Sequence, residues 1–97
     1  MVRPRLCRRV RFNPEITYFK PAGVRMRELE QVILTFDEYE AIKLIDFEGI
    51  EQIKAGEMMR ISQPTLSRLL RNARKKISEA IVNGKAIKIE GGAYKIK

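Results

Sequence analysis

The side chains best suited to chemistry gather between positions 60 and 75, and their chemistry is binding rather than bond breaking. Arginine can donate two parallel hydrogen bonds to guanine O6 and N7, and glutamine can pair with adenine N6 and N7. Hydroxyl and ammonium groups bind phosphate oxygens. The candidate DNA-binding residues are Arg60, Ser62, Gln63, Pro64, Thr65, Ser67, Arg68, Arg71, Asn72, Arg74 and Lys75. We expect no catalytic residue, metal site or cofactor among them.

The spacing of apolar residues places this set on a helix-turn-helix unit over residues 52–71. Gly56 lies where the two helices would approach most closely, and Ser62 is a good N-cap for the second helix. Pro64 is tolerated in a first turn, where the amides have no intrahelical partner. Arg60 stands where such turns usually carry glycine, so the turn is expected to be non-standard. The positions predicted to face the shared core are Ala55, Met59, Ile61, Leu66 and Leu69. The alternative is an ordinary pair of core-packed helices.

The second helix is predicted over residues 63–83, with Gly84 ending it. In such a unit it lies in the major groove, with its N-terminal residues at the base edges. The side chains opposite the apolar stripe, facing the expected groove, are Pro64, Arg68, Arg71, Asn72 and Lys75. No carboxylate occurs from position 63 to position 78.

The position of each candidate residue along this helix predicts whether it contacts bases or phosphates. The residues in the first turn and a half, where base edges are reachable, are Gln63, Thr65, Ser67 and Arg68. Farther along, Arg71, Arg74 and Lys75 are expected to contact phosphates. Thr65 and Ser67 could equally be helix-surface residues without a ligand.

Charge is divided into three blocks. Residues 1–27 hold eight Arg or Lys and one Glu, residues 28–57 hold two Lys and nine Asp or Glu, and residues 58–97 hold ten Arg or Lys and two Glu. Basic surfaces steer a protein to polyphosphate. The acidic block is expected to face away from DNA or to meet a basic partner, although charge runs are often only solvated faces.

The segment before the helix-turn-helix unit is predicted to form two helices, over residues 28–34 and 35–49. Thr35 and Glu38 form a capping-box pattern at the start of the second one, and Gly49 ends it. Its core stripe is expected to contain Phe36, Tyr39, Ile42, Leu44, Ile45 and Phe47. Its carboxylates are explained by helix-dipole and solvation roles rather than by catalysis.

Both ends of the chain are expected to be extended. Residues 1–27 are punctuated by prolines. The arginines of residues 3–9 are either a solvated tail or an arm that follows the DNA backbone or enters the minor groove, and from Val10 onward the aromatic content favours packing. At the other end, a Gly91-Gly92 turn predicts a hairpin over residues 85–97, either a wing or a surface hairpin. An isolated hairpin is marginal, so a sheet partner from residues 8–20 is expected.

Composition narrows the class of protein. Ninety-seven residues suit one domain, divided here into an arm (1–27), a helix-turn-helix domain (28–84) and a hairpin (85–97). The hydrophobic content of 44% argues against disorder. No apolar run approaches the roughly 20 residues of a membrane span, and the basic start lacks the apolar region of a signal peptide. One cysteine and no histidine argue against a disulfide framework or a zinc site. A cytoplasmic protein is expected.

The order of motifs resembles one family of small prokaryotic proteins, known as domain of unknown function 134. The segments that carry the resemblance are CRRVRFNPEITYFKPAG, LTFDEYEAIKLIDFEG, the S-x-P-T segment and GKAIKIEGG, over about residues 4–92. Members are regarded as DNA-binding proteins whose helix-turn-helix is similar to the promoter-reading fourth region of sigma factors. The resemblance implies a fold and a binding class.

We therefore predict an α+β, mainly helical protein with a trihelical helix-turn-helix core. Its expected function is sequence-specific binding of double-stranded DNA in transcription regulation, without enzymatic activity. Two alternatives remain: a module that docks on RNA polymerase through its acidic helix, and an RNA-binding protein. A homodimer would present two recognition helices to successive major grooves, and the sequence leaves the oligomeric state open.

Overall fold

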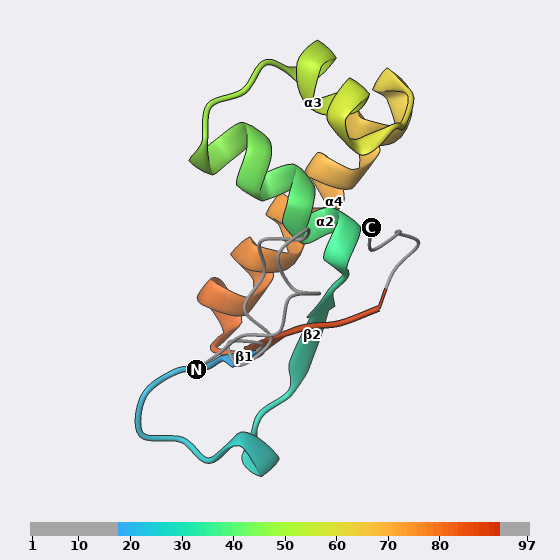
Figure 1. Cartoon of the computed structure of the whole chain (residues 1–97). Coiled ribbons are helices and arrows are strands. Elements are labelled where there is room, and N and C mark those ends of the chain that lie inside the picture. The colour runs from blue at the N-terminus through green and yellow to red at the C-terminus, as the bar shows by residue number, and fades with distance from the viewer. Residues whose placement is uncertain (1–17, 92–97) are drawn as a thin grey trace, which may run out of the picture.

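The computed structural model describes residues 18–91. A long helix crosses a shorter helical segment, and a small sheet lies at one end of the molecule (Figure 1). In chain order the elements are β1 (Tyr18–Phe19), η1 (Met26–Glu28), β2 (Gln31–Leu34), α2 (Phe36–Ala41), η2 (Ile42–Phe47), α3 (Gln52–Met59), α4 (Gln63–Asn83) and β3 (Ala86–Ile89). The predicted α+β, mainly helical class is confirmed.

Helix α2 begins at the predicted capping box. The Thr35 hydroxyl accepts from the Glu38 amide at 3.3 Å, and Glu38 Oε1 accepts from the Thr35 amide at 3.0 Å. The helix continues into η2, one π-helical stretch in which the Glu48 amide donates to the Lys43 carbonyl. It ends at Phe47, and the predicted stop, Gly49, follows with φ of +75°.

Helix α4 has the predicted bounds, Gln63–Asn83. Ser62 caps its N-terminus, and Gly84 caps its C-terminus in the left-handed region with φ of +68°. A left-handed residue directly after a helix is the usual place for glycine, which has no Cβ to clash. At about 1.5 Å per residue, the 21 residues of α4 span about 30 Å.

The prediction of a helix over residues 28–34 is wrong. After the single turn η1 the chain extends into β2, where Val32 and Leu34 are buried while Gln31 and Ile33 are exposed. This period of two is that of a strand with one covered face. β2 runs parallel to β3, from Gln31↔Ala86 to Leu34↔Ile89. The pairing joins segments more than fifty positions apart, so no local sequence pattern predicts it.

The sheet has the order β1-β3-β2, and β1 pairs antiparallel with β3. The expected sheet partner from residues 8–20 is thus confirmed by Tyr18–Phe19, which lies opposite Lys88 and Ile87. Both the predicted Gly91-Gly92 turn and the second strand of the hairpin include residues outside the described range, as does the arginine-rich arm.

Helix α4 is shared by two hydrophobic clusters. Its N-terminal half contributes to the first, whose buried members are Ala41, Leu44, Ala55, Leu66 and Leu70, with Met59, Ile61 and Leu69 packed against it. This confirms the predicted core positions of the two helices. Its C-terminal half packs on the sheet in a second cluster of Leu34, Ala73 and Ile89. Packing on both halves holds α4 in one position.

Phe47 is 84% exposed, so the prediction that it belongs to the core is wrong. A π-helical stretch takes more residues per turn than an α-helix. The apolar stripe predicted from α-helical spacing therefore does not continue inward to the end of η2.

Candidate nucleic-acid interface

Helices α3 and α4 meet at a tight corner, which we define as residues 52–66. A Cβ on Gly56 would lie 3.2 Å from Gln63 Nε2 and 3.3 Å from the Ile61 carbonyl oxygen. Both distances are shorter than ordinary van der Waals contact, so a side chain at position 56 would press on the turn and on the start of α4. The predicted close approach of the two helices at Gly56 is therefore confirmed.

Arg60 makes the turn of this corner. Its φ of 62° and ψ of 45° lie in the left-handed region, and its amide donates to the carbonyls of Gly56 and Glu57. The turn thus has the backbone that glycine usually provides, although arginine occupies it. The expectation that Arg60 would produce a non-standard turn is wrong: the usual geometry is kept, at the energetic cost of a left-handed non-glycine residue.

The first turn of α4 is largely closed by internal hydrogen bonds. Ser62 Oγ accepts from the Thr65 amide at 3.3 Å and donates to Thr65 Oγ1 at 2.9 Å. Gln63 Nε2 donates to the Gln52 carbonyl at 3.1 Å, across the corner. Pro64 has no amide hydrogen, and the Leu66 amide donates to the Ser62 carbonyl. Ser62, Gln63 and Thr65 therefore hold the corner together, which leaves them less free to contact a ligand.

The outward face of α4 is defined by five exposed side chains: Ser67, Arg68, Arg71, Asn72 and Lys75. Within the described residues, none of the three cations among them forms an ion pair or a hydrogen bond. Lys75 only contributes from one turn away to lowering the pKa of the Glu79 carboxyl, which Lys85 lowers first and most. The predicted separation of a basic outward face from the buried stripe is confirmed.

Arg74, predicted as a phosphate contact, is instead held by η2. Its Nε and Nη2 donate to the two carboxylate oxygens of Asp46 at 3.0 and 2.7 Å. The hydrogen bond from Arg74 holds the pKa of the Asp46 carboxyl below its ordinary value. A bidentate pair of this kind fixes the guanidinium plane. Arg74 therefore holds one flank of α4 against η2, and two of its nitrogens already donate to Asp46.

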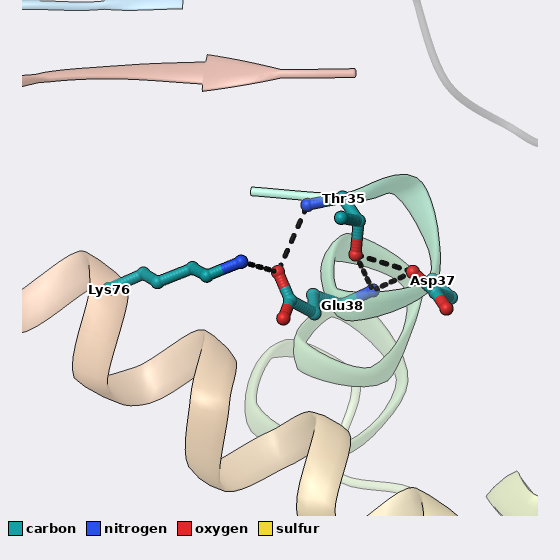
Figure 2. Close-up of polar contacts among 4 residues, drawn as sticks. All are labelled: Thr35, Asp37, Glu38 and Lys76. Atoms are coloured by element: carbon teal, nitrogen blue, oxygen red, sulfur yellow. Dashed lines mark hydrogen bonds and ion pairs between the residues drawn. The ribbon is translucent and has the colours of Figure 1, made fainter. Parts of the chain in front are cut away.

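On the opposite flank, Lys76 reaches from α4 to the start of α2 (Figure 2). Its Nζ lies 2.8 Å from Glu38 Oε1, the same oxygen that accepts from the Thr35 amide. The Glu38 side chain is 6% exposed, whereas that of Lys76 is 33% exposed. A buried carboxylate needs such partners, because an unpaired charge away from water is costly. Sequence reasoning found Glu38 as a capping residue but missed its second partner, because no local spacing links positions 38 and 76.

The described part of the chain contains neither a membrane-spanning helix nor a cluster of metal ligands. None of its helices combines the length and apolar character that crossing a membrane requires. Over residues 18–91, no group of three or more His, Cys, Asp or Glu side chains could hold a metal ion.

Comparison with known proteins gives the family. The family model described as "Protein of unknown function DUF134" matches residues 1–97. The chain belongs to the DUF134 family. A UPF0251 protein of Thermoanaerobacter pseudethanolicus is 53% identical over 96 residues, covering 99% of this chain and 81% of the relative. A UPF0251 protein of Moorella thermoacetica is 55% identical over 94 residues, covering 97% and 63%. No solved structure matches the chain.

In this DUF134 protein the candidate residues thus fall into two groups. Ser62, Gln63, Thr65 and Arg74 are engaged by hydrogen bonds within the fold. The exposed residues without such engagement are Arg60, Pro64, Ser67, Arg68, Arg71, Asn72 and Lys75. Apart from Arg60 in the turn, this second group offers cationic charge and planar hydrogen-bonding groups on one face of α4.

Proposed function

We propose that this DUF134 protein binds double-stranded DNA sequence-specifically by inserting α4 into the major groove, and that it regulates transcription. The observation that carries the proposal is the outward face of α4, where Arg68, Arg71 and Lys75 form no ion pair or hydrogen bond with the described residues. Guanidinium and ammonium groups at a helix surface suit phosphates and guanine edges.

The α3–α4 corner supports the choice of a duplex. The second helix of a helix-turn-helix unit enters the major groove while the first crosses the backbone. Here α4 is the longer helix, its outward face is free of carboxylates up to Ser78, and its inward face is fixed by two clusters. A rigid helix with an unpaired basic face matches a groove about 12 Å wide.

The charge distribution supports the same orientation. The acidic side chains Glu38 and Asp46 lie toward α4 and neutralise Lys76 and Arg74, the two cations on its flanks. The cations that remain unpaired on this helix are those on the outward face. Among the cations of α4, these are the ones that an approaching polyanion would meet unpaired.

The test compares binding of the full chain to duplex DNA, duplex RNA and single-stranded DNA by mobility shift at fixed salt. We expect duplex DNA to bind most tightly. Charge reversal by Arg71→Glu with Lys75→Glu should weaken duplex binding about a hundredfold or more, because two charge-assisted hydrogen bonds to the duplex are removed. A preference for duplex RNA or single strands would instead support the RNA-binding alternative.

A matched control makes the same change of charge elsewhere. Arg25 and Arg27 are exposed; Arg25 directly precedes η1 and Arg27 is part of it, at the opposite end of the molecule from the α3–α4 corner (Figure 1). Arg25→Glu with Arg27→Glu should weaken binding much less than the reversal on α4. Equal losses from both pairs would mean that net charge alone drives binding, and the proposal would fail.

A further inference from the structure

Two side chains on the outward face of α4 can distinguish bases as well as attract phosphate. Arg68 and Asn72 are both exposed, and neither forms a hydrogen bond or an ion pair within residues 18–91. Arginine matches guanine O6 and N7 with two donors, and asparagine matches adenine N6 and N7 with a donor and an acceptor. Asn72 carries no charge, so a phosphate would attract it far less than it attracts an arginine.

The residues before them are poorly placed to take this role. Ser62 and Thr65 are hydrogen-bonded to each other, and one donor of the Gln63 amide is used by the Gln52 carbonyl. Pro64 has no side-chain hydrogen-bonding group. The first residue of α4 that offers a free two-donor group is therefore Arg68, and the side chain one turn farther along the same row is the planar amide of Asn72.

Their spacing fixes the distance between the bases they would contact. Residues four apart lie one above the other on a helix surface. The rise of about 1.5 Å per residue separates Arg68 and Asn72 by about 6 Å along the axis. Stacked base pairs are about 3.4 Å apart, so a helix lying along the groove would place the two groups about two base-pair steps apart.

Arg71 and Lys75 form the neighbouring row on the same face, again four residues apart. The Lys75 ammonium is a point charge without a planar fork, so this row suits the phosphates that line the groove. The row of Arg68 and Asn72 would thus recognise bases, and the row of Arg71 and Lys75 would bind the DNA backbone.

We propose that Arg68 and Asn72 recognise a guanine and an adenine about two base-pair steps apart in one major groove. The inference rests on the proposed function and names the part of the duplex that gives specificity. It also shifts base recognition from the first turn of α4, where the sequence alone placed most of it, to the second and third turns.

The experiment is selection of bound duplexes from a random-sequence DNA pool by the full chain and by its variants, followed by sequencing. The native protein should enrich a motif containing G and A separated by about two steps. Arg68→Lys keeps the charge but removes the fork, so the preference for G should fall about tenfold or more, while affinity for random duplex stays within about twofold. Asn72→Ala should erase the preference for A and leave that for G.

A matched control is Ser78→Ala, which changes an exposed residue of the same helix whose hydroxyl donates to the Arg74 carbonyl. It should leave the selected motif unchanged. An unchanged motif in Arg68→Lys and Asn72→Ala would overturn the assignment while DNA binding itself stands. Duplex binding without any motif would also overturn it, and absence of duplex binding would overturn the proposed function together with this inference.

Discussion

The outward face and the flanks of α4 carry similar cations in different surroundings. On the flanks, Arg74 is held by Asp46 from η2, and Lys76 is held by the buried carboxylate of Glu38 from α2. On the outward face, Arg68, Arg71 and Lys75 have no such partner in residues 18–91. Within about three turns, α4 thus carries two kinds of cation. Those on the flanks fix the helix to the rest of the fold, and those on the outward face are free to bind a ligand.

The difference shows why the number of basic residues on a helix is a poor measure of its ligand-binding surface. A cation that already donates to a carboxylate has its charge largely balanced and fewer donors left for phosphate. An unpaired one gives up only its hydration. Lys75 and Lys76 are neighbours in the chain, yet the structure gives them opposite roles, and substitutions can separate those roles.

The largest effect on stability is expected at Lys76. Lys76→Ala leaves the Glu38 carboxylate buried with only the Thr35 amide from its former partners, and it should lower the free energy of unfolding by about 2–3 kcal/mol. Lys75→Ala should change it by less than about 0.5 kcal/mol, because Lys75 is exposed. Urea denaturation of both variants checks the contrast. Equal destabilisation would remove the distinction between face and flank.

A smaller effect, of opposite sign, is expected at the turn. Arg60→Gly relieves the cost of a left-handed non-glycine residue and should raise the free energy of unfolding by about 1 kcal/mol. Because Arg60 is also a candidate DNA-binding residue, duplex affinity should fall in the same variant. Thermal unfolding and duplex titration measure the two effects. A variant that is less stable than the native protein would show that the Arg60 side chain itself contributes to packing.

The smallest effect concerns pH. Because Arg74 lowers the pKa of Asp46, the pair stabilises the fold above the unfolded-state value of about 3.9 and loses this contribution as the pH falls through the folded-state pKa. Asp46→Asn should cost about 0.2–1 kcal/mol at pH 7, as for an exposed ion pair, and almost nothing near pH 2. Urea midpoints at the two pH values provide the measurement. The same cost at both would mean that the charge of Asp46 is irrelevant.

The sequence predicts correctly those parts of the fold that depend on residues close to one another in the chain. The bounds of α4, the Ser62 cap, the Thr35 capping box and the close approach at Gly56 each depend on residues within a few positions of one another. Sequence reasoning predicts a helix where β2 forms, because the pairing of β2 with β3 comes from the far end of the chain. It misplaces Phe47 because a π-helical stretch has no clear sequence signature.

The same limit applies to the candidate site. An outward face with Arg68, Arg71 and Lys75 follows from helical periodicity, so the sequence alone could place it. The engagement of Arg74 and Lys76 could not be predicted, since Asp46 and Glu38 lie 28 and 38 positions away in the chain. Sequence reasoning therefore places the helix and its outward face, but it does not foresee that Ser62, Gln63 and Thr65 are hydrogen-bonded within the fold.

The most direct test of the distinction between face and flank is the salt dependence of duplex affinity. Fluorescence anisotropy would follow binding of a labelled duplex by the native protein, by Arg71→Ala with Lys75→Ala, and by Asp46→Ala with Arg74→Ala. The third protein removes a whole ion pair and keeps the net charge. Each phosphate that the protein no longer neutralises should reduce the slope of log affinity against log salt by about 0.9. We expect a reduction of about 1.8 for the outward pair, as two phosphates at about 0.9 each, and none for the flank pair. Equal slopes in all three proteins would contradict the assignment of the outward face of α4 as the DNA-binding surface.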